Sequence, residues 1–358
     1  MKAQNLKSNI SNPISLTIFT LVLGLASLPS ANPAARIICV AGCGSPITGT
    51  ALGTRLIEPF AVAFDKQDNW YICEYKGERI TKVDVNGTSS IFAGEGAAGD
   101  QLKFNDPHGL VISKDQQMYI ADTLNHRVVK IDLKTGHSAI IAGTGKVGYS
   151  GDGGPAIHAT FNQLYAVDIN RSGGKLYITD LGNRRIRLLD LKSGFVTTIA
   201  GNGQSGAPVD GADARQSPLV DPRAAAIDSK GNLYILERRG NALRVIDKNG
   251  KIRTLIGPGV GSKDSPSLNG PKHICVDLQD NIIIADTENH LIRKYNPKDN
   301  STVVIAGSGE NGDRLVPDDP LKTQLNRPHG VFVHPSGAWY ISDSDNHRVL
   351  KLDQYRER

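Results

Sequence analysis

The sequence predicts an all-β protein folded as a six-bladed β-propeller, and three observations lead to this prediction. Turn-forming residues are abundant, with 38 glycines and 18 prolines among 358 residues. A unit of four short β-rich runs recurs six times along the chain. One further run of the same kind stands alone near the N-terminus, while the last unit lacks its fourth run. Many short strands separated by turns are typical of all-β architectures.

The landmark of the repeat is an acid that follows an aromatic or aliphatic residue by three places in the second run, as in Tyr119 and Asp122. Successive acids lie 48 to 58 residues apart, and six copies cover the chain from about residue 37 to residue 353. Self-similarity at such a period indicates a propeller or a solenoid. The landmark acids are Glu74, Asp122, Asp180, Glu237, Asp286 and Asp343.

The two ends of the chain favour a closed ring. Five units finish with an apolar run and a glycine, as in Ile141-Ala142-Gly143, but the sixth ends after Leu352-Asp353 without one. Residues 37–42 have the pattern of the missing run, so we expect them to form the outermost strand of the last blade. A solenoid would need capping repeats instead, which favours the propeller.

The N-terminus has the order of a secretory signal peptide. Lys2 and Lys7 precede an apolar run over residues 14–28, and small residues follow it. This run is shorter than the roughly 20 residues of a membrane-spanning helix, so no stable membrane anchor is expected. We therefore expect a signal peptide over residues 1–35, a propeller over 36–358, and a secreted or periplasmic protein.

Charge and cysteine content narrow the partners further. The net charge of +5 would fall to about +3 after removal of Lys2 and Lys7, which gives no reason to expect a nucleic-acid partner. Four cysteines permit two disulfides in an oxidising compartment. Cys39 and Cys43 could pair locally, whereas Cys73 and Cys275 lie in predicted strands and are explained at least as well as small buried hydrophobes.

Segments 119–128, 284–292 and 341–349 resemble the NHL repeat, which is named for an Asn-His-Leu triplet. The resemblance implies a propeller over about residues 37–353. It implies no single activity, because NHL propellers include enzymes, binding scaffolds, sensor ectodomains and RNA-binding modules. His126, His290 and His347 recur at one repeat position, so we interpret these triplets as turn and blade-to-blade hydrogen bonding.

The glycine-rich connectors carry no nucleotide or calcium motif. Residues 143–148 match G-x-G-x-x-G, but a second glycine-rich stretch follows instead of a helix. Asp152 within that stretch lacks the ligand spacing of a calcium loop.

One position in each repeat is expected to surround the mouth of the central channel, where the innermost strand begins. Two histidines, a tyrosine and two cations could converge there as a ligand-binding site. His273 lies one place later and is expected to point elsewhere. The six predicted mouth residues are Phe60, His108, Tyr165, Arg223, Lys272 and His329.

Two of these positions also resemble the zinc-binding segments of the peptidylglycine amidating lyases, which are NHL-type propellers. Residues 106–109 and 327–330 match a Pro-His-Gly pattern, whereas Pro271-Lys272-His273 is out of register. The resemblance implies His108 and His329 as zinc ligands, with Tyr165 and Arg223 as catalytic residues. Calcium is the other metal that we consider for this position. Alternatively, both histidines are solvated residues that donate hydrogen bonds to neighbouring backbone.

These observations lead to three functional hypotheses. The first is an exported binding or interaction module that contacts a protein or small-molecule ligand through its channel mouth or its connector-rich face. The second is a metal-assisted lyase or lactone hydrolase, with Tyr165 as acid/base and Arg223 or Lys272 as an anion clamp. The third, cytosolic RNA binding, would require the N-terminal apolar run to be retained inside the cell.

Overall fold

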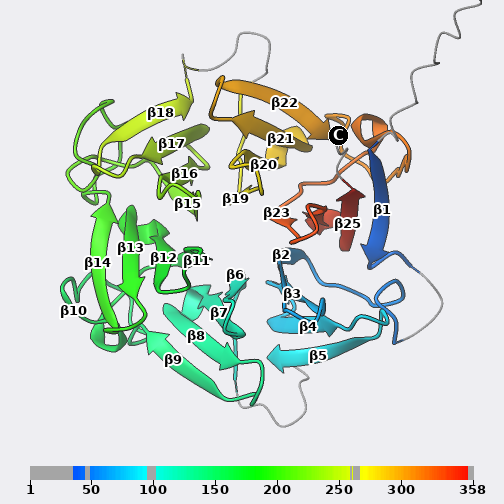
Figure 1. The fold of residues 1–358 in the computed structure, drawn as a ribbon, viewed down its shortest axis with the longest axis horizontal. Coiled ribbons are helices and arrows are strands. Elements are labelled where there is room, and N and C mark those ends of the chain that lie inside the picture. The colour runs from blue at the N-terminus through cyan, green and yellow to red at the C-terminus, as the bar shows by residue number, and fades with distance from the viewer. Residues whose placement is uncertain (1–34, 45–48, 95–101, 259, 261–266, 354–358) are drawn as a thin grey trace, which may run out of the picture. The chain divides into compact units, whose positions relative to one another are not determined.

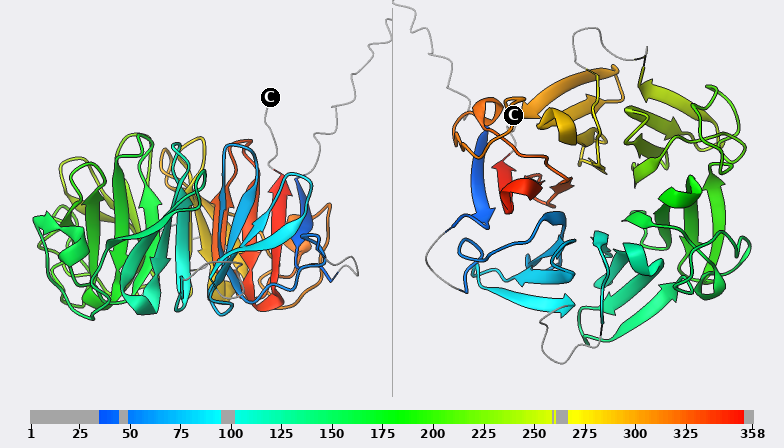
Figure 2. Two further views of the ribbon diagram at one scale, coloured as in Figure 1. Left: turned by 90° about the horizontal axis from the view of Figure 1, so that it is seen from below. Right: turned by 180° about the vertical axis from the view of Figure 1, so that it is seen from behind.

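The computed structural model describes residues 35–44, 49–94, 102–258, 260 and 267–353. Six antiparallel sheets are arranged around a central axis (Figure 1), and the strands of each sheet run along that axis (Figure 2). The predicted six-bladed propeller is confirmed. Apart from Ala35, the expected signal peptide lies outside the described residues.

Each blade is built from four strands in sequence order, except at the closure of the ring. The innermost strands are β2 (Pro59–Phe64), β6 (Pro107–Ile112), β11 (Leu164–Ile169), β15 (Pro222–Ile227), β19 (His273–Val276) and β23 (Gly330–Val333). The second strands are β3 (Trp70–Glu74), β7 (Gln117–Asp122), β12 (Lys175–Asp180), β16 (Leu233–Glu237), β20 (Ile282–Asp286) and β24 (Trp339–Asp343). The third strands are β4 (Arg79–Val83), β8 (Arg127–Asp132), β13 (Arg185–Asp190), β17 (Ala242–Ile246), β21 (Leu291–Asn296) and β25 (Arg348–Asp353). The outermost strands are β5 (Ser89–Gly94), β9 (Ser138–Ala142), β14 (Phe195–Ala200), β18 (Ile252–Ile256), β22 (Ser301–Ala306) and β1 (Arg36–Ala41), and the two-residue β10 (Gly154–Pro155) lies outside β14.

The core lies between neighbouring blades because both faces of the second strands are covered. Every residue of β16 and β20 is buried, which explains why these strands are almost continuously apolar. Leu236 of the fourth blade and Ile284 of the fifth belong to one buried cluster. The stability of each blade therefore depends on the next.

The landmark acids organise the turn after the second strand. Asp122 is buried and accepts hydrogen bonds from the side chains of Asn125, at 2.9 Å, and Arg127, at 2.7 Å. His126 follows the 3-10 turn η1 (Thr123–Asn125) in the left-handed conformation, and its Nδ1 accepts the backbone N–H of Gln163 in the next blade at 3.1 Å. The prediction that these triplets serve turn and blade-to-blade hydrogen bonding is confirmed.

The same contact recurs at two other seams. The turn η4 (Thr287–Asn289) precedes His290, whose Nδ1 accepts the backbone N–H of Arg327 at 3.1 Å. The turn η6 (Ser344–Asn346) precedes His347, which accepts the backbone N–H of Glu58 at 3.2 Å and so joins the last blade to the first.

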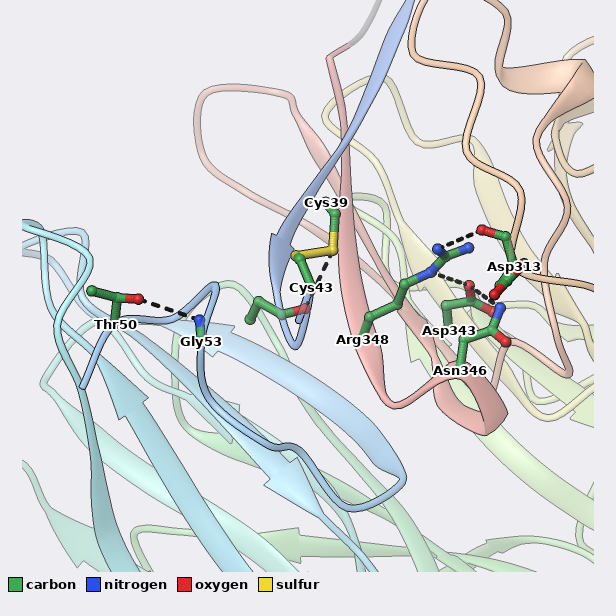
Figure 3. Close-up of a disulfide and its surroundings, with 9 residues drawn as sticks. Cys39, Cys43, Thr50, Gly53, Asp313, Asp343, Asn346 and Arg348 are labelled. Carbon is green, nitrogen blue, oxygen red and sulfur yellow. Dashed lines mark hydrogen bonds and ion pairs between the residues drawn. A yellow bond between two sulfur atoms is a disulfide. The ribbon is translucent and has the colours of Figure 1, made fainter. Parts of the chain in front are cut away.

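The N-terminal strand closes the ring as expected. β1 pairs antiparallel with β25, with Ile37 opposite Leu352, and the Ile37 side chain is fully buried. A disulfide joins Cys39 to Cys43 at the end of this strand, beside Arg348 and Asp343 of the last blade (Figure 3). Cys73 and Cys275 are free thiols.

The glycine-rich connector after β9 is tied to the third blade by its polar residues. Asp152 accepts a hydrogen bond from Arg187 at 2.8 Å and another from the Tyr149 hydroxyl at 2.8 Å. These hydrogen bonds give Asp152 a structural role that requires no bound cation. Within the described residues, no helix has the length and apolarity needed to cross a membrane.

Candidate functional site at the channel mouth

Side chains from all six blades meet where the innermost strands begin. Phe60, His108, Tyr165 and Arg223 lie at the starts of β2, β6, β11 and β15, while Lys272 and His329 immediately precede β19 and β23. We call these six residues, together with Tyr75, the mouth cluster. The structure brings all six predicted positions together.

Phe60 lies near the centre of the mouth cluster. Its ring centroid is 4.9 Å from that of His108 in the second blade and 5.4 Å from that of His329 in the sixth. It also lies 5.6 Å from the guanidinium of Arg223, which belongs to the fourth blade. One phenyl ring therefore contacts side chains from three other blades at this end of the axis.

Both histidines are buried, so the expectation of solvated mouth histidines is wrong. His108 is 5% exposed and His329 is 3% exposed, because the rings of Phe60 and Tyr75 pack against them. His108 does contact neighbouring backbone, with its Nδ1 2.7 Å from the carbonyl oxygen of Asp106. Burial, followed by the positive charge of Arg223, holds the pKa of His108 well below its ordinary value. The imidazole is therefore neutral.

Arg223 is a buried cation that stacks on an aromatic ring. Its guanidinium carbon lies 3.4 Å from the ring centroid of Tyr165, and the side chain is 6% exposed. The Arg223 Nε is buried without a hydrogen-bond partner, and no carboxylate of the described residues lies within the 4.0 Å ion-pair distance. Although burial lowers the pKa of Arg223 to about 10, the guanidinium stays charged at neutral pH.

Lys272 is the second buried basic group of the mouth cluster. Its Nζ donates to Nε2 of His329 at 2.5 Å, and it makes no ion pair within the part of the chain that the structure describes. Burial, with Arg327 and Arg223 nearby, lowers the pKa of Lys272 to about 7. Burial and the Lys272 charge likewise hold the pKa of His329 well below its ordinary value, and the other ring nitrogen, Nδ1, is buried without a partner.

The acids at the rim of the mouth are engaged elsewhere. Glu288 accepts a hydrogen bond from Arg327 at 2.8 Å and lies 3.9 Å from Arg238, while Asp106 pairs with Lys76 at 3.1 Å. Because these carboxylates already contact rim cations, they do not neutralise Arg223 or Lys272 by direct contact. Arg223 and Lys272 therefore have no carboxylate in direct contact, although the charges of Asp221 and Glu288 act on them from a greater distance.

The residues do not fit the catalytic zinc site implied by the lyase resemblance. Open zinc sites use three protein ligands, and the described residues contain no group of three or more His, Cys, Asp or Glu side chains suited to a metal. Moreover, Nδ1 of His108 and Nε2 of His329 already have protein partners, and two cations surround the pair. The same charges disfavour calcium, which needs six to eight oxygen ligands.

His273 makes its hydrogen bond away from the polar groups of the mouth cluster, although its ring centroid lies 6.4 Å from that of Phe60. Its Nδ1 is 3.1 Å from the carbonyl oxygen of Val331, and its ring packs against Phe332 with centroids 4.5 Å apart. Burial lowers the pKa of His273 to about 4, so this side chain is neutral at physiological pH.

Sequence reasoning missed two residues at the mouth, Tyr75 and Arg238. Tyr75 packs on His108 with ring centroids 4.8 Å apart, and the charge of Arg238 helps to lower the pKa of both Arg223 and Lys272. Each residue directly follows a landmark acid, where three blades have the small residues Thr123, Thr287 and Ser344 and one has Leu181. A large polar side chain at that repeat position was the sequence feature that could have identified Tyr75 and Arg238 as mouth residues.

Comparisons with known proteins agree that the chain contains NHL repeats. The sequence model of the teneurin NHL domain matches residues 189–357, and that of the NHL repeat matches residues 104–131. NHL repeat-containing protein 2 of Bos taurus is 25% identical over 341 residues, which cover 83% of this chain and 47% of that protein. SUPPRESSOR OF QUENCHING 1 of Arabidopsis thaliana is 26% identical over 275 residues, covering 71% of this chain and 25% of that protein. The chain thus spans half or less of the length of these relatives.

Solved structures share the fold at low identity. An auxiliary nutrient binding protein from Bacteroides ovatus superposes with a TM-score of 0.64 at 14% identity, covering 89% of this chain and 76% of the other. A gluconolactonase from Xanthomonas campestris gives a TM-score of 0.57 at 12% identity, covering 89% of each chain. At such identities the likeness concerns the fold alone.

Proposed function

Because the chain is an NHL-repeat β-propeller, a type of protein-interaction module, we propose that it is an exported binding module whose mouth cluster holds an anionic group of its ligand. The ligand is a protein or a small molecule that presents a carboxylate or a similar anion. The single observation that carries this proposal is the pair of buried cations, Arg223 and Lys272, without a carboxylate partner among the residues described.

Buried charges are normally paired, because removing an ion from water is costly unless an opposite charge or several hydrogen bonds compensate. The face of the Arg223 guanidinium stacks on the ring of Tyr165, but the Arg223 Nε has no hydrogen-bond acceptor. The Lys272 ammonium has a neutral imidazole as its partner. An anion bound between them would supply the missing acceptor and the missing charge.

The aromatic side chains give the site a second property. Phe60, Tyr75 and Tyr165 surround the buried polar groups, and such apolar walls strengthen charge-assisted hydrogen bonds by excluding water. The mouth cluster is therefore suited to a carboxylate attached to an apolar or aromatic body. Export is supported by the signal-peptide pattern of residues 1–35 and is compatible with the Cys39–Cys43 disulfide.

A calorimetric titration of the mature protein with benzoate tests the proposal, with benzamide as a neutral probe of the same shape. We expect benzoate to bind about 10- to 100-fold more tightly, the range for a hydrogen bond to a charged group. Arg223→Gln should abolish this preference, whereas Arg253→Gln, at an exposed site, should preserve it. Equal affinities of the wild type for both probes, or an unchanged preference in Arg223→Gln, would refute anion binding at the mouth.

A further inference from the structure

The far end of the central channel contains a cavity that is separate from the mouth cluster. All six innermost strands begin at the mouth, so their later residues surround the opposite end. There they line a cavity of about 350 Å³, within the size range of small-molecule sites. Its walls are mainly aliphatic and aromatic, as at Val111, Ile227 and Phe332.

One carboxylate interrupts this apolar lining. Asp168 occupies the third place after the mouth residue of its blade. The same place in the other blades has apolar side chains or a thiol, and all six side chains line the cavity. These five counterparts are Ala63, Val111, Ala226, Cys275 and Phe332.

Asp168 has a backbone partner but no cation. Its Oδ2 accepts the backbone N–H of Ile227 in the fourth blade at 3.0 Å. Arg171 also lines the cavity, but its exposed guanidinium lies 3.7 Å from Asp280. No Lys, Arg or His of the described ranges comes within ion-pair distance of Asp168. An apolar cavity with an uncompensated carboxylate is complementary to a cation with a hydrocarbon body.

We propose that this cavity binds a small apolar amine, with its ammonium group on Asp168 and its hydrocarbon part against the apolar walls. The ammonium provides the positive charge that the carboxylate lacks, together with hydrogen-bond donors in addition to the backbone N–H groups of Ile227 and Ile169. The hydrocarbon part leaves water on entering the cavity, which favours binding through the hydrophobic effect. The site does not depend on the mouth cluster.

Matched probes separate the charge from the hydrocarbon. We would titrate the mature protein with hexylammonium and with hexan-1-ol at pH 7.5, using calorimetry or ligand-detected NMR. The wild type should bind the ammonium about 10- to 100-fold more tightly than the alcohol. Asp168→Asn should equalise the two affinities. This variant keeps a side-chain oxygen that can accept the Ile227 N–H, so the link between the third and fourth blades is preserved.

A second arm uses pH. Burial raises the pKa of Asp168 to about 6, so the preference for hexylammonium should be complete at pH 7.5 and should be lost as the pH falls through 6. The neighbouring groups do not change charge in this window. Burial lowers the pKa of His273 to about 4 and raises the pKa values of Cys275 and Tyr177.

Arg223→Gln distinguishes this proposal from anion binding at the mouth, because it should impair benzoate binding and leave hexylammonium binding intact. Three results would each overturn the amine site. They are equal affinity of the wild type for hexylammonium and hexan-1-ol, a preference that persists in Asp168→Asn, and a lack of hexylammonium binding.

Discussion

Replacing Lys272 with methionine should stabilise the fold while weakening anion binding. The buried ammonium has a pKa of about 7 instead of its ordinary 10.5. This displacement corresponds to about 5 kcal/mol against the charged form in the folded state. Methionine has a similar length and no charge. It loses the hydrogen bond to His329, which costs about 1 to 2 kcal/mol, so a net gain of about 3 kcal/mol is expected at pH 7.

The pH dependence gives the sharper test. Lys272 binds its proton more weakly in the folded than in the unfolded state, so its penalty is complete below pH 7 and shrinks as the pH rises towards 10.5. The stability difference between Lys272→Met and the wild type should therefore be largest at or below pH 7 and become small near pH 10. A group with a raised pKa would produce the opposite trend.

Urea unfolding at pH 6, 7, 8 and 9 measures this difference, and benzoate titration of the same samples measures function. Lys248→Met, on an exposed turn, is the control and should change stability by less than about 0.5 kcal/mol. Benzoate affinity should fall in Lys272→Met and stay unchanged in the control. If Lys272→Met is less stable than the wild type at pH 6 and 7, or if the difference does not vary with pH, the interpretation of Lys272 as an uncompensated buried cation is wrong.

Two further predictions concern the N-terminal region. Deleting residues 36–43 should lower the free energy of unfolding by about 3 kcal/mol or more, relative to a chain that begins at Ala35. The deletion removes the fully buried Ile37 and exposes the edge of β25. An unchanged melting curve would contradict a closing role for β1. Protein purified from its native host should begin between about Asn32 and Ile37, and mass spectrometry of the N-terminal peptide can determine this. An intact segment 1–28 in a cytosolic fraction would instead favour the RNA-binding alternative.

The fold could be predicted because its signals repeat. Each landmark acid is weak evidence alone, but six copies at similar spacing define six equivalent blades, and the structure gives each acid the same buried place at the end of the second strand. The orphan run over residues 37–42 was equally informative, since Ile37 had to find a partner strand and only the last unit lacked one.

The chemistry of the site was less accessible to sequence reasoning. The repeat register located His108, Arg223 and Lys272 at one end of the channel, yet whether they are solvated or buried depends on how closely the blades approach. Phe60 and Tyr75 decide this by covering the polar groups. The Asp168 cavity was missed because its residues follow the mouth positions and are apolar in most blades, which is also the pattern of an ordinary core strand.

The two Pro-His-Gly segments show how a scaffold requirement can resemble a catalytic motif. Asp106 and Arg327, which precede them, have φ values of 49° and 46°, and the prolines follow this turn into the strands. Gly330 is required by packing, since a Cβ there would lie 2.1 Å from the carbonyl oxygen of Phe60 in the adjoining blade. Three of the four positions in each segment thus serve the approach of one blade to the next.

The remaining position is the one that the fold leaves free to vary. It holds histidine in two blades, but phenylalanine, tyrosine, arginine and lysine in the others, and the ligand depends on the six side chains as a set. Under the proposed function, two buried basic groups with neutral histidines and aromatic rings would favour an anion, whereas three inward histidines on the same backbone would favour a metal. Proteins that share this fold at 12% to 14% identity share its backbone arrangement, and that likeness does not identify the ligand of this chain. The ligand of this chain has to be sought from the charged groups near its own axis, which are Arg223 and Lys272 at the mouth and Asp168 at the far end.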